Sequence, residues 1–383
     1  MTNKKALVVG GSNGIGLAIT HKLLEKYQTV YIIDKNDPDP SLTNKSVIYK
    51  KQNLISDDLS CLNDITDIDT LVITAGFGRV SYFENLVDAE IVNSFKINTI
   101  SVIRIIKHYY TQIKSDHNFN CAVMCSIAGL VSSPLFSIYA ATKAALCRFI
   151  ESVNIELEHS GVANRILDVS PGSIKGTQFA NGKNDLSLTA CLAQDIIDKM
   201  FSKQTRFVPN PDVFDKVIAD YKADERAYGL HSIKYKLENG RLSTTPQVKI
   251  GYLSGTFDLF HIGHLNILRR AKSICDFLVV GVHKNGSHKN KPTFIPFEER
   301  VDIVRSIKYV DMVIESESED CDVYKKGIVE YHYLFVGSDY KGTERFNKYE
   351  EFFKDKPVEI VYFPYTQGTS STELRNFITS NTK

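Results

Sequence analysis

Several features that mark other classes of protein are missing from this sequence of 383 residues. Lysine and arginine (46) nearly balance aspartate and glutamate (45), so no overall basic field favours nucleic acid or an anionic membrane. No apolar run reaches the roughly 18 residues of a membrane span. The N-terminal residues lack the apolar core and cleavage site of a signal peptide. We therefore expect a cytoplasmic protein that binds neither nucleic acid nor membrane.

Paired cysteines are also missing, because the seven cysteines include no Cys-x-x-Cys. An odd number without zinc-type spacing predicts reduced thiols and not a disulfide framework. Cys121 and Cys125 lie in an apolar strand-like run, where burial is the expected role. We therefore predict no metal site from the sequence.

The composition that is present, with 43% hydrophobic and 24% charged residues, suits a globular protein with hydrophobic cores. The length suits two domains. Strand-like apolar runs alternate with helix-compatible segments, and the pattern fades after Arg206–Pro209 before it resumes at Val248–Leu253. This alternation predicts an α/β fold of two doubly wound, Rossmann-like domains with mainly parallel sheets. We expect domains at 1–245, with an extension and linker from about 211, and at 246–383.

The individual elements follow from the same runs. Strands of the first domain are expected at Ala6–Val9, Thr29–Ile33, Thr70–Ile73, Ala122–Cys125 and Arg165–Val169. Its helices are expected at Gly16–Lys26, Asp88–Thr111 and Ala140–Leu157, and one or two surface helices follow, best placed at Asp212–Ala227. Later strands of the second domain are expected at Phe277–Val282, Met312–Ile314, Tyr333–Val336 and Glu359–Phe363.

A glycine-rich turn follows the first expected strand and leads into a helix. Glycines there permit close approach of backbone N–H groups to a pyrophosphate at the helix N-terminus. The residues expected at this cofactor site are Gly10, Ser12, Asn13, Gly14, Ile15 and Gly16. Asp34 closes the second strand and is either an ordinary strand-terminal residue or the acceptor for the adenosine ribose hydroxyls. Lys35 beside it suits a 2′-phosphate, so the choice between NAD and NADP stays open, with NAD slightly favoured.

Three polar residues in the middle of the first domain predict carbonyl chemistry. Tyr139 and Lys143 are four residues apart and share one face if the segment is helical. A phenol, with a reference pKa near 10, is a poor acid–base at neutral pH unless a nearby cation stabilises its phenolate. Lys143 supplies that cation, and Ser126 at a strand end is placed to hydrogen-bond the carbonyl being reduced.

Together these features resemble the short-chain dehydrogenase/reductase family over about residues 3–210. Val9–Gly16 matches its TGxxxGxG pattern with valine in place of threonine, and Ile73–Gly76 is a looser match to its NNAG segment. Tyr139 and Lys143 form its YxxxK motif. The resemblance implies further cofactor contacts at Ala75, Gly76, Pro171 and Gly172.

The resemblance also implies roles in NAD(P)-dependent hydride transfer. Tyr139 would donate the proton, Lys143 would lower its pKa and bind the cofactor ribose, and Ser126 would polarise the carbonyl. Asn98 falls where the family has an asparagine that anchors a proton-relay water. The reverse oxidation is chemically equivalent.

Ser173–Leu186 is expected to form a lid over the substrate. Thr177 lies one residue later than the family's PGxxxT spacing, which makes its cofactor contact less secure. Lys175 and Lys183 either meet a substrate phosphate or are solvated loop lysines.

The second domain opens with two histidines at the start of an expected helix. His261 and His264 are three residues apart, so both imidazoles can face one place, and Gly263 between them permits close approach of a substrate. A zinc site needs further ligands, and none lies nearby in sequence. Two imidazoles at a helix N-terminus fit stabilisation of a reacting phosphate better.

This segment resembles the HxGH nucleotidyltransferase superfamily, and within it the glycerol-3-phosphate cytidylyltransferase group, over about 248–380. The matching motifs are Gly255–His264, Pro296–Arg300, Val336–Gly342 and Gly368–Thr372. The resemblance implies that His261 and His264 stabilise the transition state of cytidylyl transfer from CTP with Mg²⁺. It implies nucleotide contacts from Gly255, Thr256, Phe257, Asp258, Gly263, Lys291, Arg300, Gly337, Asp339, Gly368, Ser370, Ser371 and Thr372.

Two details of the second domain leave its triphosphate contacts open. Tyr365 stands where the family often has an arginine, so that contact is lost or supplied elsewhere. The basic stretch from Lys284 to Lys291 is either a solvated loop or the source of a triphosphate-binding lysine, with Lys291 favoured over Lys289.

The two chemistries together predict a bifunctional enzyme that makes a CDP-polyol for surface polymers such as capsules. A ketose phosphate, such as ribulose 5-phosphate or dihydroxyacetone phosphate, would be reduced and then activated with CTP. Alternatives are cytidylyl transfer before reduction, another alcohol or nucleotide, and a reductase fold that serves only as a scaffold. A homodimer or tetramer is expected.

Overall fold

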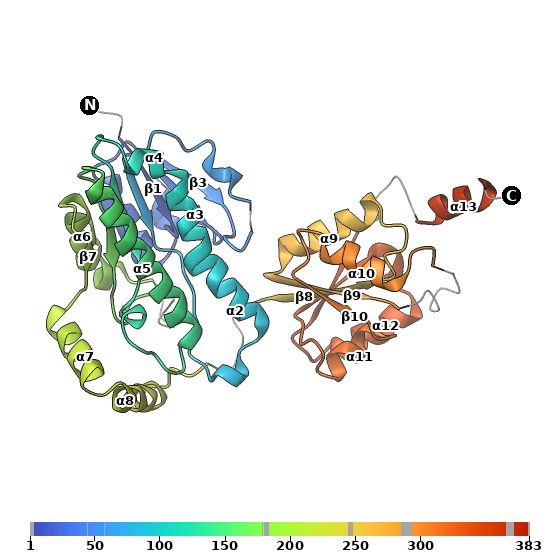
Figure 1. Ribbon diagram of the computed structural model, residues 1–383. Helices are drawn as coiled ribbons and strands as arrows, with labels where there is room; N and C mark the ends of the chain where they lie inside the picture. The colour runs from blue at the N-terminus through green and yellow to red at the C-terminus, as the bar shows by residue number, and fades with distance from the viewer. Residues whose placement is uncertain are drawn as a thin grey trace. The chain divides into compact units, whose positions relative to one another are not determined.

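The protein is described here from a computed structural model. It covers residues 4–43, 45–56, 58–177, 179, 184–243, 248–284, 293–364 and 371–381. The chain divides into two compact units, Met1–Pro246 and Gln247–Lys383. Each unit is an α/β domain with a parallel sheet, as the sequence predicts (Figure 1). No helix in the part of the chain described is long and apolar enough to cross a membrane.

The first unit contains a seven-stranded parallel sheet in the order β3-β2-β1-β4-β5-β6-β7. Its strands are β1 (Lys5–Val9), β2 (Thr29–Asp34), β3 (Val47–Lys51), β4 (Thr70–Ile73), β5 (Asn120–Met124), β6 (Ile166–Val169) and β7 (Arg206–Phe207). The strand order reverses between β1 and β4, and such a switch point is where doubly wound folds bind ligands. The sequence does not predict β3, because this edge strand is only partly buried and ends in two lysines.

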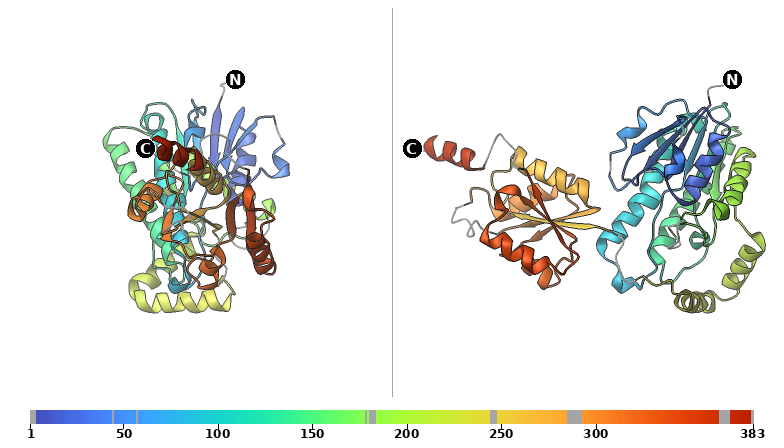
Figure 2. Two further views of the ribbon diagram at one scale, coloured as in Figure 1. Left: turned by 90° about the vertical axis from the view of Figure 1, so that its right-hand side faces the viewer. Right: turned by 180° about the vertical axis from the view of Figure 1, so that it is seen from behind.

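Helices cover both faces of this sheet (Figures 1 and 2). Apolar side chains of α1 (Gly14–Leu24) and α6 (Leu186–Phe201) build the core on one face. The other core takes residues from α3 (Ser101–His108) and α5 (Ser137–His159). The remaining helices of this unit are α2 (Asp88–Phe95), α4 (Tyr110–Ile113), α7 (Pro211–Ala223) and α8 (Glu225–Glu238).

The structure corrects two helix predictions in the first unit. The helix expected over Asp88–Thr111 is interrupted by a π-helical turn at Lys96–Ile100, and π turns often mark functional positions. The sequence predicts one or two surface helices, best placed at Asp212–Ala227. The structure has α7 and α8 there, and the predicted segment runs past the end of α7 into α8. Asp224 separates them because its extended backbone ends α7, while its side chain caps α8 by accepting from Ala227 N at 2.8 Å.

The second unit contains a five-stranded parallel sheet in the order β10-β9-β8-β11-β12. Its strands are β8 (Ile250–Gly255), β9 (Phe277–Val282), β10 (Met312–Glu315), β11 (Tyr333–Gly337) and β12 (Glu359–Phe363). The helices are α9 (Ile262–Ile274), α10 (Phe297–Arg305), α11 (Asp320–Lys325), α12 (Glu344–Phe353) and α13 (Ser371–Asn381). Apolar residues of α9 and α10 pack against β8, β9 and β11. The order again reverses beside the first strand, so β8 and β11 flank the switch point.

Candidate functional site

The turn between β1 and α1 brings backbone very close to backbone. Gly10 has φ +88°, and a Cβ there would lie 2.6 Å from Ala75 N. A Cβ on Gly16 would lie 2.1 Å from Gly10 O. Only glycine fits at both positions, and the turn delivers the chain directly into the N-terminus of α1. Ile15 is buried in the same turn, and Gly76 follows Ala75 after β4.

The residues next to this turn fit a dinucleotide. Asp34 accepts hydrogen bonds from Ser12 N and Asn36 N, both at 3.0 Å, which fixes its carboxylate beside the turn. The Ser12 hydroxyl is fully buried and has no hydrogen-bond partner within the part of the chain described. A buried hydroxyl without a protein partner is costly unless a ligand or water satisfies it.

One contact at the turn was not predicted from the sequence. Gly14 N donates to Asn184 Oδ1 at 2.9 Å, and Asn184 Nδ2 donates to Asn13 Oδ1 at 3.1 Å. Asn184 belongs to the expected lid segment, 170 residues away in sequence from Gly14. The lid therefore reaches the N–H groups predicted to bind pyrophosphate. Lys175 of the lid is exposed.

The Tyr139 and Lys143 side chains are both buried on α5, with 8% and 2% of their surface exposed. Lys143 Nζ lies 5.6 Å from the centroid of the Tyr139 ring and donates to Met124 O at 2.7 Å. Burial raises the pKa of the Tyr139 phenol, and a hydrogen bond with Ser126 lowers that pKa in part. Burial lowers the pKa of the Lys143 ammonium. The structure thus brings the predicted triad together.

Ser126 and Asn98 approach this triad from two other elements. Ser126 follows β5, and its hydroxyl accepts from Ala128 N at 3.2 Å. Asn98 is fully buried in the π turn. Its Nδ2 donates to Phe77 O at 2.8 Å and to Thr142 Oγ1 at 3.1 Å, while its Oδ1 accepts from Phe77 N at 2.9 Å. Asn98 therefore ties the loop after β4 to α5, one residue before Lys143.

The residues predicted after β6 lie against the same site. Pro171 O accepts from Ile127 N at 3.1 Å, so this segment borders the turn that follows Ser126. A Cβ on Gly172 would contact Ile127 Cδ1 at 3.4 Å. Thr177 is buried beside Gly14, with its Cβ 3.3 Å from the position of a Gly14 Cβ. Thr177 therefore lies against the glycine turn, although it comes one residue later than in the family's PGxxxT motif.

A group of potential metal ligands lies beneath the triad. Single atoms of Cys125, Cys147 and Asp168 lie within 4.8 Å of one another, and all three residues are buried. Asp168 is already paired with Arg206 Nε at 2.9 Å and accepts from the Ser170 hydroxyl at 2.6 Å. A neighbouring guanidinium disfavours a divalent cation, so we interpret the group as a buried polar cluster.

In the second unit, His261 caps α9 and His264 lies one turn later, with ring centroids 4.0 Å apart. His261 Nδ1 accepts from Gly263 N at 3.0 Å, and His264 Nδ1 accepts from His261 N at 3.4 Å. A neutral imidazole that accepts at Nδ1 carries its proton at Nε2. Burial lowers the pKa of His261, although Glu373 opposes this. Both rings therefore present Nε2–H donors without needing a positive charge.

The loop between β8 and α9 has an unusual backbone. Phe257 and Leu259 have φ of +53° and +49°, a backbone region that residues other than glycine rarely adopt. Phe257 is 3% exposed, and its ring lies edge-on to His264 with centroids 5.4 Å apart. Such strain persists only where surrounding packing holds it, and it is concentrated at functional sites.

Asp258 in this loop is held by three backbone and side-chain donors. Phe294 N and Ile295 N donate to its carboxylate at 3.0 to 3.2 Å, and Arg375 of α13 pairs with it at 3.0 Å. The role of Arg375 was not predicted, although its position four residues after Ser371 places both on one face of α13. Its guanidinium lies beside the histidine-bearing loop.

Arg300 is fully buried, and its guanidinium donates to backbone carbonyls. The acceptors are Ile295 O, Thr256 O, His283 O and Lys284 O. The sequence suggests that Arg300 helps to position the nucleotide. These contacts show that it joins the loops after β8 and β9, so any positioning acts through those loops.

Gly337 and Asp339 lie at the carboxyl end of β11, next to the switch point. A Cβ on Gly337 would lie 2.4 Å from Asp339 Oδ1, so a larger residue there would displace the Asp339 carboxylate. Thr343 ends the same loop and caps α12, accepting from Phe346 N at 3.4 Å.

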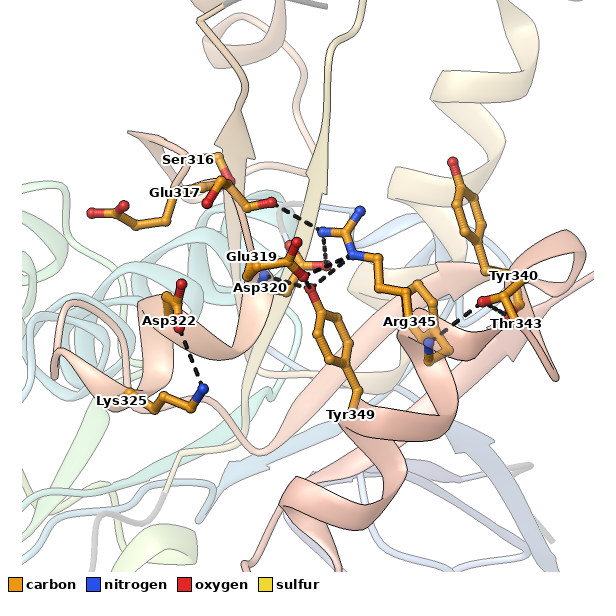
Figure 3. A network of polar contacts seen from close by, with 12 residues as sticks. Ser316, Glu317, Glu319, Asp320, Asp322, Lys325, Tyr340, Thr343, Arg345 and Tyr349 are labelled. Carbon is orange, nitrogen blue, oxygen red and sulfur yellow. Dashed lines mark hydrogen bonds and ion pairs between the residues drawn. The ribbon is translucent and has the colours of Figure 1, made fainter. Parts of the chain in front are cut away.

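A polar network fixes α12 against the loop after β10 (Figure 3). Arg345 Nε donates to Glu319 at 3.0 Å and to the Tyr349 hydroxyl at 2.9 Å. Tyr349 in turn donates to Glu319 and accepts from Asp320 N at 3.0 Å. This network positions the helix that follows the Gly337–Asp339 loop.

Several predicted residues lie outside the part described. These are Lys183, Lys289, Lys291, Tyr365, Gly368 and Ser370. Ser371 and Thr372 begin α13, but their side chains are also outside it.

Comparison with known proteins agrees with the two motif sets. The short chain dehydrogenase model matches residues 4–186, and the cytidylyltransferase-like model matches residues 252–377. The chain is a fusion of a short-chain dehydrogenase domain and a cytidylyltransferase-like domain. Both families consist of enzymes.

The relatives described next each match one of the two domains. Glycerol-3-phosphate cytidylyltransferase of Bacillus subtilis (strain 168) is 37% identical over 128 residues, covering 32% of this chain and 92% of the relative. An uncharacterized oxidoreductase of Saccharomyces cerevisiae is 30% identical over 190 residues, covering 47% of this chain but 58% of the relative. A Burkholderia cenocepacia short chain dehydrogenase structure covers 61% of this chain and 99% of its own, with TM-score 0.51 and 20% identity, a likeness of fold alone.

Proposed function

We propose that the fusion makes a CDP-polyol: it reduces a ketose phosphate with NAD(P)H and transfers a cytidylyl group from CTP to the polyol phosphate, releasing pyrophosphate. The observation that carries this proposal is that one chain holds both an assembled Ser126–Tyr139–Lys143 set and a His261–His264 pair with oriented Nε2–H groups. Reduction converts the ketose carbonyl to a hydroxyl, and a phosphate oxygen of the resulting polyol phosphate then attacks the α-phosphate of CTP and displaces pyrophosphate. Such activated polyols supply surface polysaccharides.

In the reductase domain, the residues present fit a nicotinamide dinucleotide. The unpaired Ser12 hydroxyl, the fixed Asp34 carboxylate and the close-packed glycine turn carry this fit. Bound NAD(P)H supplies the hydride. The Tyr139 phenol donates a proton to the carbonyl oxygen, since burial keeps it protonated at neutral pH. Ser126 orients that oxygen, and Lys143 places its positive charge beside the phenolate that forms.

The nicotinamide preference is proposed from Asp34. Its carboxylate, held by Ser12 N beside the glycine turn, supports NAD, because it would accept from a 2′-hydroxyl and repel a 2′-phosphate. The Burkholderia structure was solved in complex with NADP, so the fold itself accommodates NADP as well. Lys175 and Lys183 are proposed contacts for the substrate phosphate.

In the transferase domain, the Nε2–H groups of His261 and His264 stabilise charge on the α-phosphate during attack by the polyol phosphate. Neutral imidazoles serve this role because their protons already point away from the backbone. Arg375, paired with Asp258 beside this loop, is the proposed replacement for the arginine missing at Tyr365. Mg²⁺ would enter with CTP, as it does for triphosphates in general.

The order of the two reactions is tested by product masses. The full chain is incubated with NAD(P)H, Mg²⁺ and a panel of ketose phosphates, with and without CTP. A polyol phosphate formed without CTP supports reduction first. A CDP-ketose formed without NAD(P)H supports the reverse order, and pyrophosphate release without any reduction would mean that the reductase fold is a scaffold. The assembly is proposed to be a dimer or tetramer, which light scattering of the same sample measures.

A further inference from the structure

The inward face of α8 ends in a buried lysine. Gly229, Ser232, Ile233 and Lys236 are spaced as one stripe of a helix, and they are the positions that face the rest of the first unit. Such a stripe is normally apolar, yet Lys236 has only 5% of its surface exposed. The helix lies beyond residues 4–186, the part that the dehydrogenase family model matches.

Lys236 uses all of its donors on one short loop and its own helix. Its Nζ donates to Ser133 Oγ at 2.9 Å, to Pro134 O at 2.6 Å and to Ser232 Oγ at 3.0 Å. An ammonium group has three N–H donors, so this set is complete. Burial and the nearby positive charge of Arg241 lower the pKa of Lys236 to about 8. Burying an ammonium group is costly unless its N–H groups are hydrogen-bonded, and the Ser133–Pro134 loop supplies two of the three acceptors of Lys236.

The loop that Lys236 holds leads directly to Tyr139. Leu135 adopts φ +63°, which is strained for a leucine, and its carbonyl accepts from Ser81 N at 2.7 Å. The next residue, Phe136, stacks on the Tyr139 ring with centroids 4.1 Å apart and planes 14° from parallel. The loop therefore sets the position of a ring that lies flat against the proposed proton donor.

The chain that follows α8 packs against the same part of the first unit. Leu242 and Ile233 pack against the buried cluster Val80, Leu135, Phe136 and Tyr139. Ser243 N donates to Val80 O at 2.9 Å, and Ser243 O accepts from Arg79 Nη1 at 2.9 Å. Arg79 is itself fixed by a buried pair with Glu90. Residues from the loops after β4 and β5, at the ligand-binding edge of the sheet, thus meet α8 and its tail.

We propose that α8 and residues 241–243 form one wall of the reductase site, and that Lys236 is a positioning residue that holds Phe136 against Tyr139. This rests on the proposed reductase function. Without the three donors, the Leu135 strain is relieved by movement of the loop, and the Tyr139 ring loses its flat support. The phenol then sits away from the carbonyl oxygen. Cofactor binding should be unaffected, because within the residues described no hydrogen bond joins the glycine turn to α8.

The test compares Lys236→Met with Lys234→Met in the full chain. Lys234 lies on the same helix, has 72% of its side chain exposed and makes only a loose pair with Glu238 at 3.8 Å. For Lys236→Met we expect kcat for reduction to fall at least about tenfold, because small misplacements of reacting groups are expensive. The dissociation constant for NAD(P)H should stay within about twofold of the wild type, and so should pyrophosphate release when the polyol phosphate and CTP are supplied directly. Lys234→Met should leave all three quantities unchanged.

Hydrogen exchange supplies a readout that needs no substrate. Backbone amides of residues 131–139 should exchange faster in Lys236→Met and at the wild-type rate in Lys234→Met. Ser232→Ala, which removes one of the three contacts, should give a smaller change of the same kind if Lys236→Met fails to fold. If amide exchange of residues 131–139 is unchanged in Lys236→Met, Lys236 does not hold the loop. If exchange is faster but kcat for reduction is normal, Lys236 has no positioning role. If the wild-type protein reduces no ketose phosphate, the proposed function is wrong. The exchange measurement still shows whether Lys236 holds the loop.

Discussion

The two domains place their reactive groups in opposite ways on similar sheets. In the reductase domain the proposed catalytic side chains are buried in the first turns of a long helix, and Lys143 donates to a strand-end carbonyl. In the transferase domain His261 is itself the helix cap, and backbone N–H groups orient both imidazoles. The first arrangement tunes pKa values by burial, whereas the second orients neutral donors.

Of the changes that test this difference between the domains, Tyr139→Phe is expected to have the largest effect, on the rate of reduction. Removing the phenol removes the proton donor, so reduction should fall by about a thousandfold or more, of the order expected for general acid catalysis. Pyrophosphate release should remain at the wild-type rate when the polyol phosphate and CTP are supplied directly. NAD(P)H oxidation with the ketose phosphate and pyrophosphate formation with the polyol phosphate are measured in parallel, with Tyr82→Phe at an exposed position as control. Loss of both activities would contradict two independent sites.

His264→Ala is the converse change. It removes one oriented Nε2–H donor, so pyrophosphate release should fall by about a hundredfold, as for loss of one preformed donor elsewhere. Reduction of the ketose phosphate should be unaffected. Wild-type turnover of CTP in this variant would exclude the histidine pair from the reaction.

Arg375→Met tests whether α13 supplies the guanidinium missing at Tyr365. The KM for CTP should rise by about tenfold, since a charge-assisted contact is worth roughly 1.5–3 kcal/mol. Arg269→Met on α9 is the matched control, because Arg269 is exposed and bonds only Asn266 in the described contacts. Equal KM values in the two variants would assign the triphosphate contact to other residues.

The smallest expected effect is that of Asp34→Ala on cofactor choice. Without the carboxylate, NADH should bind about five- to tenfold more weakly, while NADPH should change less, since one neutral-to-charged hydrogen bond is lost only for NADH. Dissociation constants come from nicotinamide fluorescence, with Asp37→Ala at an exposed position as control. A parallel loss for both cofactors would show that Asp34 does not read the ribose.

The sequence predicts the fold class and both families, and the structure and the comparisons confirm them. These predictions rest on local signals, such as the spacing of Tyr139 and Lys143, that a helix converts directly into proximity. The contacts of Asn184 and Arg375 could not be predicted in this way, because their partners lie 170 and 117 residues away. The π turn at Asn98 could not be predicted from hydrophobic periodicity either, because one extra residue in a helical turn does not change the composition of the segment.

The Asn184 bond to the glycine turn has a kinetic consequence. Gly14 N has a single proton, so it cannot serve Asn184 and a pyrophosphate oxygen at once. If Gly14 N binds the pyrophosphate, as the family resemblance implies, each cofactor that enters must displace Asn184 from it. Cofactor association would then be slower than free diffusion allows, because a side chain must leave before binding.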